Sequence, residues 1–349
     1  MLQRTLPNNQ HASVPTGMLC RLVQIAGERS IDSSGWFHGL HLTPAEIDDP
    51  ATRVSYRQAV EFITRALQAL DQPDLGLLVG RQQNAGNFGL IGMAMQTAQN
   101  FGEAVQLALV YQRVAGTLMQ VELEDGPAAG EVALLARAPE VPAALLPFLC
   151  EELFSSSTMV ARELLGDDFR PLRLTLTYPA PAHAEQYAAL FGCEVRFNQP
   201  CNLLAMDKAW MAVGFPGYTP FTARLAQELC QRQLDAIGAP HGEIAASVER
   251  YLRQRLPENP SLAAIAEHLH LSERTLRRHL AAEGAGFNSL HDRIRTERAL
   301  ELLRDANLSV AHIGARIGFS DPREFRRAFK RWTGRTPSEA RAGMVGREP

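Results

Sequence analysis

The sequence predicts an α+β N-terminal domain followed by an all-α C-terminal domain with two helix-turn-helix units joined by a long helix. Three observations support this fold class. Helical and strand patterns are mixed in the first 236 residues, only helical patterns follow, and the later patterns occur twice. With 349 residues, of which 46% are hydrophobic, the chain is long enough to form two ordinary cores.

The boundary between the domains is predicted from glycine and proline. The stretch D-A-I-G-A-P-H-G-E, residues 235–243, lies between two helical patterns, as a short linker does. We therefore predict domains over 1–236 and 244–349, with a linker over 237–243. The charge changes at the same place: residues from 241 onward hold 19 Lys and Arg against 14 Asp and Glu, a net of +5, and the preceding part has a net charge of −8.

Hydrophobic periodicity predicts the elements of the N-terminal domain. Helices are expected at 59–70, 101–116, 143–165 and 221–236, and strands at 118–124, 131–138, 173–178 and near Val195 and Leu203. Strands and helices do not alternate regularly, so this order indicates an α+β domain rather than a β-α-β fold.

No motif in the N-terminal domain predicts catalysis. The segment has neither a G-x-G-x-x-G after a strand nor a G-x-S-x-G turn, so no catalytic residue and no cofactor are expected. Glu151, Glu152 and Arg162 share the helix at 143–165 and are interpreted as solvated surface, with contact to a ligand as the alternative. The sequence does not identify the residues that bind a ligand.

Cysteine usage and hydropathy exclude two further classes. The five cysteines are scattered without a C-x-x-C pair, so neither a metal site nor a disulfide framework is expected. No apolar run reaches the roughly 18 residues of a membrane span, and no apolar stretch follows the basic residue near the N-terminus. We expect a cytoplasmic protein that does not associate with a membrane.

The C-terminal domain contains a capped helix with one cationic face. In G-F-S-D-P-R-E-F-R-R-A-F-K-R-W-T-G, residues 318–334, Asp321 is the predicted N-cap, Pro322 suits the first helical position, and Glu324 is placed to close a capping box. Phe325 and Phe329 are four apart and are predicted to face the core. A different face carries four cations and no acid: Arg323, Arg326, Arg327 and Lys330.

An upstream segment repeats this helix with an offset of 49 residues. In L-H-L-S-E-R-T-L-R-R-H-L, residues 269–280, Ser272 is the predicted N-cap, and Leu276 and Leu280 are the predicted inward pair. The matching cations are Arg274, Arg277 and Arg278. The preceding helices, S-L-A-A-I-A-E-H-L and S-V-A-H-I-G-A-R-I, match with an offset of 48. The two copies indicate an internal duplication.

Each copy has the layout of a helix-turn-helix unit, with a long amphipathic helix over 287–304 as the spacer. Gly318 is expected to adopt the left-handed conformation in the second turn. His270 occupies the equivalent place in the first turn, so that turn is expected to be either slightly strained or differently shaped.

The paired cationic helices predict binding to double-stranded DNA. A helix fits the major groove of B-DNA, where arginine reaches guanine with two hydrogen bonds and neighbouring cations pair with phosphates. The alternative is that these side chains only solvate two surface helices. The predicted DNA-binding residues are Arg274, Thr275, Arg277, Arg278, Arg323, Arg326, Arg327 and Lys330.

Residues from about 243 to 341 resemble the AraC/XylS-type DNA-binding domain. The resemblance is carried by S-L-A-A-I-A, L-S-E-R-T-L-R-R and the stretch beginning G-F-S-D-P-R-E-F-R-R-A-F-K-R-W-T-G-R-T-P. It implies that the three arginines of each cationic helix face the bases. Many relatives carry a small polar or aromatic residue at the positions of Arg323 and Glu324. The DNA sequence of the second half-site therefore cannot be inferred from the operator of another family member.

The N-terminal domain resembles that of one AraC subgroup, described as arabinose-binding-like and shared with ornithine-utilisation regulators. The stretches that carry this resemblance are P-D-L-G-L-L-V-G-R-Q-Q-N-A-G-N-F-G-L-I-G-M-A-M (73–95) and L-F-G-C-E-V-R-F-N-Q-P-C-N-L-L-A (190–205). The description does not identify a sugar as the ligand.

Together the resemblances imply a bacterial transcription regulator, an activator that contacts RNA polymerase and promoter DNA and is controlled by an unidentified small-molecule effector. A homodimer is left open, and the protein is expected at the nucleoid when it binds DNA. Two alternatives stay open: a metabolic enzyme tethered to DNA, and a DNA-binding regulator that needs no effector.

Overall fold

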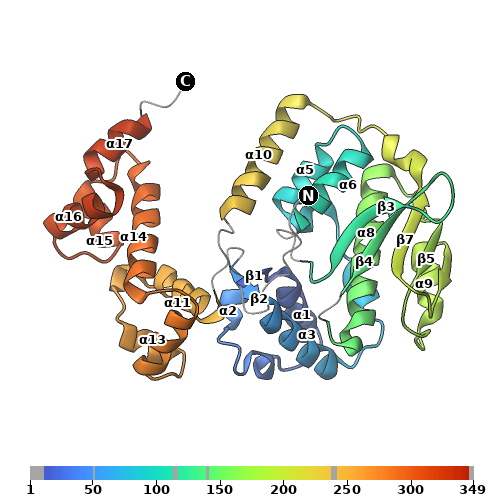
Figure 1. Ribbon diagram of the computed structural model, residues 1–349, viewed down its shortest axis with the longest axis horizontal. Coiled ribbons are helices and arrows are strands. Elements are labelled where there is room, and N and C mark those ends of the chain that lie inside the picture. Colours follow the sequence, from blue (N-terminus) through green and yellow to red (C-terminus); the bar gives the residue numbers. More distant parts are fainter. Residues whose placement is uncertain (1–11, 50–51, 113–116, 139–140, 237–241, 346–349) are drawn as a thin grey trace. The chain divides into compact units, whose positions relative to one another are not determined.

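The computed structural model describes residues 12–49, 52–112, 117–138, 141–236 and 242–345. These residues form two compact units (Figure 1). The first comprises the described residues among 13–40 and 47–240, and the second comprises residue 12 and the described residues among 41–46 and 241–349. Of the predicted linker at 237–243, only Gly242 and Glu243 are described, so the predicted domain boundaries stay a prediction.

The first unit contains a five-stranded sheet with the strand order β3-β4-β7-β5-β6. The strands are β3 (Gln120–Asp125), β4 (Glu131–Arg137), β5 (Arg173–Thr175), β6 (Glu194–Arg196) and β7 (Asn202–Asp207). The pairs are antiparallel except for β5 and β6, which are parallel and are connected through α9 (Ala184–Phe191). The predicted α+β class is confirmed.

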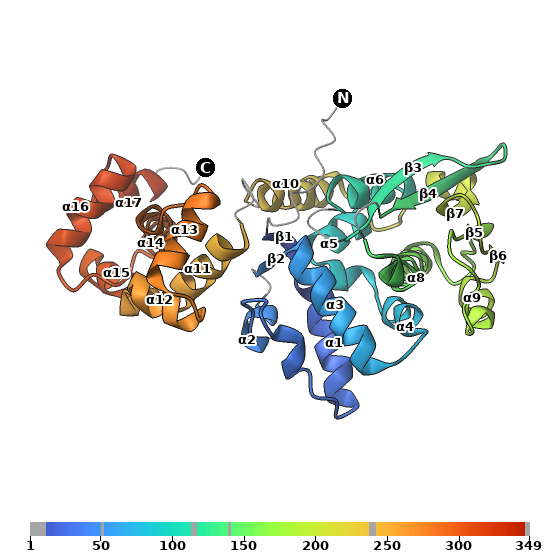
Figure 2. The same ribbon diagram turned by 60° about the horizontal axis from the view of Figure 1, so that its bottom comes forward.

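One face of the sheet is covered by α6 (Phe101–Val110) and α8 (Leu146–Leu165) (Figure 2). The shared core contains Phe101 and Val105 of α6, Ala161 of α8, and Val132 and Met206 of the sheet. Burial of this apolar surface fixes the position of α8 on the sheet. The other faces of α8 are left to contact the surrounding helices.

Two glycines let α4 (Leu75–Arg81) approach α8 closely. A Cβ atom on Gly76 would lie 2.5 Å from the carbonyl oxygen of Phe148, and one on Gly80 would lie 1.8 Å from the hydroxyl oxygen of Ser155. Only glycine fits at both positions, which are four apart on one face of α4. This contact fixes the rotation of α8 about its axis.

The remaining elements of the first unit are mainly helical. They are β1 (Ala12–Pro15), α1 (Gly17–Glu28), α2 (Pro44–Ile47), β2 (Arg53–Ser55), α3 (Tyr56–Leu70), α5 (Leu90–Gln96) and α10 (Pro220–Ala236), with parts of β1 and α2 assigned to the second unit. The predicted helices at 59–70, 143–165 and 221–236 correspond to α3, α8 with its preceding 3-10 turn, and α10. Helix α6 ends at Val110, and residues 113–116 of its predicted extension lie outside the described residues.

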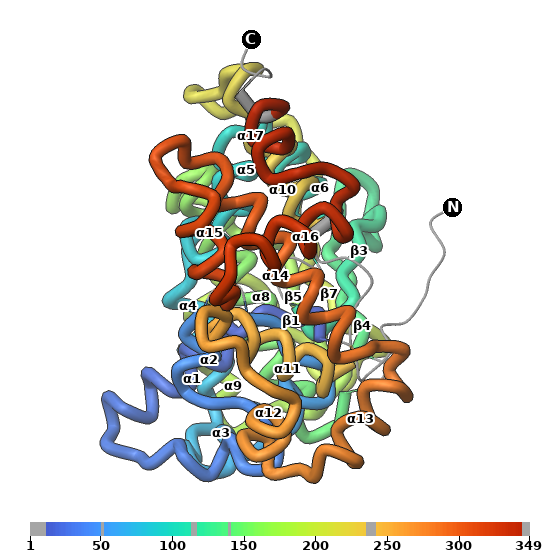
Figure 3. The backbone as a smooth tube through the Cα atoms, turned by 90° about the vertical axis from the view of Figure 1, so that its left-hand side faces the viewer, coloured from blue at the N-terminus to red at the C-terminus, as the bar shows by residue number. Residues whose placement is uncertain are grey.

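From Glu243 onward, the regular elements of the second unit within its described part are helices. Its helices are α11 (Glu243–Gln254), α12 (Leu262–His268), α13 (Glu273–Ala282), α14 (Phe287–Leu303), α15 (Val310–Arg316), α16 (Pro322–Thr333) and α17 (Pro337–Val345). A single apolar core runs through them. Figure 3 follows the chain from α13 through α14 to α16, so the predicted spacer helix connects the two repeats.

A short segment from early in the sequence belongs to this unit. Residues 41–46 lie beside α11, where Arg250 forms an ion pair with Glu46 at 3.0 Å and donates to the carbonyl oxygen of His41 at 3.0 Å. Both charged side chains are almost completely buried. Removal of either partner would leave an uncompensated charge in the protein interior.

The two helix-turn-helix turns have the same backbone conformation. The N–H of Leu271 donates to the oxygen of Ala266 at 2.8 Å, and the N–H of Phe319 donates to the oxygen of Gly314 at 2.9 Å. His270 has φ of 55° and Gly318 has φ of 88°, both in the left-handed region. Of the two outcomes expected for His270, the structure shows the strained one, because a residue with a Cβ atom keeps the shape that glycine adopts in the other copy.

We predict that His270→Gly stabilises the protein. The left-handed conformation costs a non-glycine residue about 1–2 kcal/mol, and glycine loses roughly 0.5–1 kcal/mol more in chain entropy on folding, so the net gain is about 0.5–1 kcal/mol. His270 is exposed, so the substitution removes little packing. Urea unfolding of the two proteins measures the difference, and a lower midpoint for the variant would contradict the strain at this position.

Candidate functional site

Helices α13 and α16 begin with side-chain caps, as predicted. Ser272 accepts a hydrogen bond from the N–H of Thr275 at 3.1 Å, and Asp321 accepts one from the N–H of Arg323 at 2.8 Å. The predicted capping box at Glu324 is wrong for the described structure. Asp321 binds the second N–H of the helix, not the third, and no reciprocal bond from Glu324 is present among the described residues. The first turn of each helix is still fixed by one side chain.

The inward faces of the two helices are equivalent. Leu276 and Leu280 of α13 and Phe325 and Phe329 of α16 are fully or almost fully buried in the common core. The buried pairs match with the predicted offset of 49 residues. Because residues three or four apart lie on one face of a helix, burying these pairs leaves the cationic stripes on other faces.

All seven predicted cations on these helices are exposed: Arg274, Arg277, Arg278, Arg323, Arg326, Arg327 and Lys330. Within the described residues, Arg277 is the only one that forms an ion pair, with Glu273 at 3.6 Å. Thr275 is half-buried, and its hydroxyl lies 2.9 Å from that of Ser272. The predicted site residues therefore lie on two similarly built helices, with Thr275 also engaged in the helix cap.

Several other arginines of the same unit form ion pairs. Ion pairs join Arg253 to Glu297 at 2.6 Å, Arg298 to Glu301 at 2.8 Å, and Arg293 to Glu249 and Glu297, all on α11 and α14. The paired arginines and the predicted site cations belong to the same compact unit, so the difference in pairing is not a difference between the two units. Six of the seven predicted site cations on α13 and α16 have no acidic partner among the described residues and are available to an external anion, whereas Arg331 on α16 pairs with Asp292 at 3.2 Å.

A half-buried arginine on the spacer helix holds the second turn. The Nε of Arg295 donates to the carbonyl oxygen of Ile317 at 3.0 Å, and an Nη donates to the side-chain oxygen of Asn259 at 2.7 Å. The guanidinium also lies 4.5 Å from the ring centroid of Phe319. Arg295 therefore joins α14 to the turn that precedes α16. The sequence pattern did not distinguish this arginine from the exposed ones.

The first unit contains a cavity of about 610 Å³. Its walls come from α1, α3, α5, α6, α8 and the sheet, and they are mainly apolar. Representative lining residues are Leu19, Ile63, Ile91, Val105, Leu134 and Met206. A cavity of this size and composition is typical of a small-molecule site.

The interpretation as solvated surface is wrong for Glu151, whereas Glu152 and Arg162 are half-buried. Glu151 is only 1% exposed and accepts hydrogen bonds from the hydroxyl of Tyr187 at 2.5 Å and from His183 at 2.7 Å. Glu152 lines the cavity. Arg162 donates to the carbonyl oxygen of Leu190 at 2.9 Å. Because α8 is covered on several sides, a charged residue on it is not necessarily exposed to solvent.

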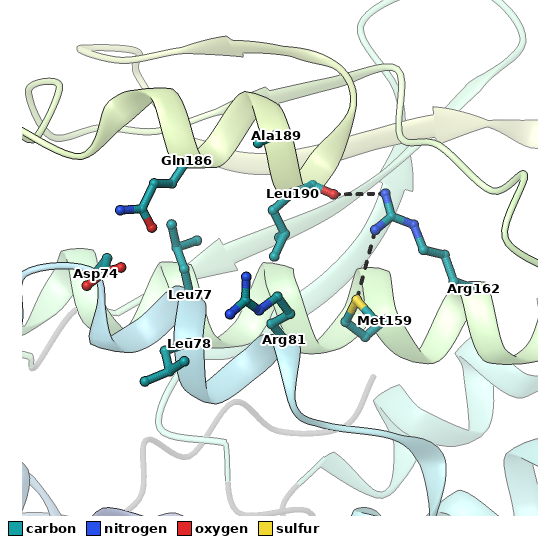
Figure 4. Close-up of a pocket in the computed structure, with 9 residues that line it drawn as sticks. All are labelled: Asp74, Leu77, Leu78, Arg81, Met159, Arg162, Gln186, Ala189 and Leu190. Atoms are coloured by element: carbon teal, nitrogen blue, oxygen red, sulfur yellow. Dashed lines mark hydrogen bonds between the residues drawn. The ribbon is translucent and has the colours of Figure 1, made fainter. Parts of the chain in front are cut away.

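A second hollow of about 490 Å³ lies between α4, α8 and α9 (Figure 4). Asp74, Arg81, Arg162 and Gln186 line it together with apolar side chains. The guanidinium of Arg162 bonds backbone carbonyls there, and Asp74 accepts from Gln72 at 2.9 Å. Two of its charged groups therefore already have partners within the protein.

We predict that Glu152→Gln stabilises the protein at pH 8 and has little effect at pH 5. Burial raises the pKa of Glu152 to about 7. Between the unfolded pKa near 4.5 and this value, the folded state retains a proton that the unfolded chain releases, so stability falls as the pH rises through that window. Glutamine carries no such penalty, and the gain at pH 8 is roughly 2–3 kcal/mol. Denaturant titrations at both pH values test this, and equal gains would contradict it.

The described residues contain neither a membrane-spanning helix nor a cluster of metal-ligating side chains. None of the helices there combines the length and apolar character needed to span a bilayer. The same residues contain no group of three or more His, Cys, Asp or Glu side chains arranged to hold a metal ion.

Comparison with protein families matches both units. Residues 31–214 match the family described as the arabinose-binding domain of AraC transcription regulator, N-terminal, and residues 265–343 match a helix-turn-helix domain. The first match covers more than half of the chain.

Two relatives agree with this assignment in sequence. The chain is 31% identical to the ornithine utilization regulator of Pseudomonas aeruginosa over 94% of its own length and 96% of that protein. It is 27% identical to the regulator VqsM of the same organism, over 76% and 83% of the two chains. The crystal structure of the regulator CdpR from that organism aligns with 93% of this chain and 98% of its own at 22% identity and a TM-score of 0.48. The chain belongs to the AraC family of DNA-binding transcriptional regulators with an arabinose-binding-like N-terminal domain.

Proposed function

We propose that this regulator recognises an operator with two half-sites through α13 and α16, and that a small molecule bound in the N-terminal domain controls it. The observation that carries the DNA-recognition proposal is the difference in pairing between the arginines of one unit. Arg253, Arg293 and Arg298 on α11 and α14 have acidic partners, whereas six of the seven predicted site cations on α13 and α16 form no ion pair within the described residues. Phosphates and guanine edges supply the missing acceptors.

We assign one major groove to each of the two repeats. The exposed residues Arg274, Arg277 and Arg278 would enter one major groove, and Arg323, Arg326 and Arg327 the next, about 34 Å away along one face of the duplex. Lys330 and Thr275 would bind phosphates beside the bases. Such a protein acts in the cytoplasm, at the nucleoid when it is bound to DNA.

Genome-wide mapping of bound DNA tests this function. The expected result is a set of promoters that share two short motifs separated by about one helical turn. Reporter transcription from these promoters should rise in the presence of the protein, as expected for an activator that contacts RNA polymerase. Binding spread evenly over the chromosome would contradict sequence-specific recognition, and falling transcription would indicate a repressor.

A homodimer is supported by one face of α10. Phe221 and Leu225, four apart on this helix, are 71% and 47% exposed, whereas Ala226 and Cys230 on another face are buried in the core. An exposed apolar pair on a helix whose opposite face is already covered is suited to a second chain. We predict that Phe221→Lys shifts the protein from dimer to monomer in analytical ultracentrifugation. A wild-type protein that sediments as a monomer would refute this arrangement.

A further inference from the structure

The cavity of the first unit has one polar strip in a mainly apolar wall. Six residues of helix α8 line the cavity. They occur as adjacent pairs that repeat every four residues, so they lie on one face of the helix. These residues are Glu152, Leu153, Ser156, Ser157, Val160 and Ala161. A carboxyl group and two hydroxyl groups therefore lie toward one end of the face, and small apolar side chains lie toward the other.

Glu152 is the charged group of this wall that has no partner. No hydrogen bond or ion pair joins its carboxyl group to any residue in the part of the chain that the structure describes, and burial raises its pKa to about 7. Glu152 is half-buried, and a half-buried carboxylate without a partner is less favourable than a paired one, so a ligand that supplies the partner gains binding energy.

The other charged residues that line the cavity already have interactions. Arg21 donates to Gln24 at 3.3 Å, Asp48 accepts from the thiol of Cys20 at 3.3 Å, and Arg53 donates to the carbonyl oxygen of Thr52 at 2.9 Å. The cavity therefore presents one uncommitted negative group to a ligand.

We propose that this cavity binds an amphipathic amine, whose ammonium group pairs with Glu152 and whose apolar body lies against α5, α6 and the sheet. The proposal rests on the proposed control by a small molecule and names its site and chemical class. The serine hydroxyls beside Glu152 can accept the remaining N–H bonds of a primary ammonium group. A fatty acid fits less well, because its carboxylate would approach Glu152, and a small hydrophilic amino acid would leave much of the apolar wall uncovered.

The test compares ligands of one length with different head groups. Decylamine, 1-decanol and decanoate, each below its critical micelle concentration, are titrated into the full-length protein by calorimetry, with L-ornithine and L-arabinose as hydrophilic probes. We expect decylamine to bind at least about tenfold more tightly than decanol, and decanoate more weakly than both. Tightest binding of decanoate, ornithine or arabinose would overturn the assignment.

Variants separate the head-group contact from general apolar binding. Glu152→Gln should lose about tenfold or more in decylamine affinity while keeping its affinity for decanol, which also shows that the cavity is intact. Glu185→Gln is the matched control, because Glu185 is an exposed carboxylate on α9 outside the cavity. Unchanged decylamine affinity in Glu152→Gln, or an equal loss in Glu185→Gln, would refute the contact.

Operator binding, measured separately, distinguishes this inference from the proposed function. If decylamine binds in a Glu152-dependent manner but changes neither operator affinity nor transcription, the cavity assignment stands and its role in effector control fails. If a carboxylate or a sugar controls operator binding equally well in wild type and Glu152→Gln, effector control stands and the amine assignment fails.

Discussion

Replacing Arg278 and Arg327 together by alanine should weaken binding to the specific operator by about 2–6 kcal/mol. Each arginine contributes about 1–3 kcal/mol if it contacts a guanine with two hydrogen bonds. The two residues lie on α13 and α16, separated by the spacer helix, so their effects should be nearly additive. Both are exposed and form no ion pair within the described residues, so the loss should arise in the complex and not in the folded protein.

Fluorescence anisotropy with operator and scrambled duplexes at several salt concentrations provides the measurement. Arg298→Ala is the control, because Arg298 is exposed but paired with Glu301 at 2.8 Å. A loss that is similar for operator and scrambled DNA, with a salt slope lower by about one per residue, would assign these arginines to phosphates. Unchanged operator affinity, or an equal loss in the control, would refute their assignment as the recognition residues.

Gly318→Ala should destabilise the second unit by about 2–4 kcal/mol. A Cβ atom at this position would lie 2.5 Å from the carbonyl oxygen of Leu256 and 3.2 Å from an Nη of Arg295, and φ of 88° is unfavourable for alanine. Backbone cannot move aside as a flexible side chain does, so the turn itself must shift. Because Arg295 holds that turn, the position of α16 should change with it.

Urea unfolding and operator binding of the same variant test this chain of effects. The expected result is a lower unfolding midpoint and a weakened contact with the half-site read by α16, as seen by footprinting, while the half-site read by α13 remains protected. His270→Gly at the equivalent turn is the matched comparison and should shift stability in the opposite direction. A Gly318→Ala protein with wild-type stability would show that the turn accommodates a side chain.

The DNA-binding half was largely predictable from the sequence because its signals are local. Ser272 and Asp321 mark helix starts, Phe325 and Phe329 mark a buried face by their spacing, and the duplication confirms each assignment independently. Caps and i, i+4 spacing depend on residues within one turn of helix, so the linear sequence contains them.

Some local features of the N-terminal half were also predicted, but helix α1 was not. Its sequence, G-M-L-C-R-L-V-Q-I-A-G-E, begins with glycine, and the preceding Thr16 makes no side-chain cap. Leu19 and Leu22 are buried by contacts with distant parts of the chain, so tertiary packing compensates for weak local signals there.

The sequence by itself determined the two-part architecture, the duplicated helices and the cationic stripes, since each depends on periodicity or composition over a few residues. Only the tertiary structure decided which charged groups have partners. Glu152 and Glu151 are neighbours on one helix, yet one faces a cavity and the other bonds Tyr187 and His183. Arg295 and Arg298 are three residues apart, yet Arg295 bonds the turn before α16 and Arg298 is exposed to solvent. A residue's partners come from segments far away in the chain, and the free energy of burying a charge depends on those partners.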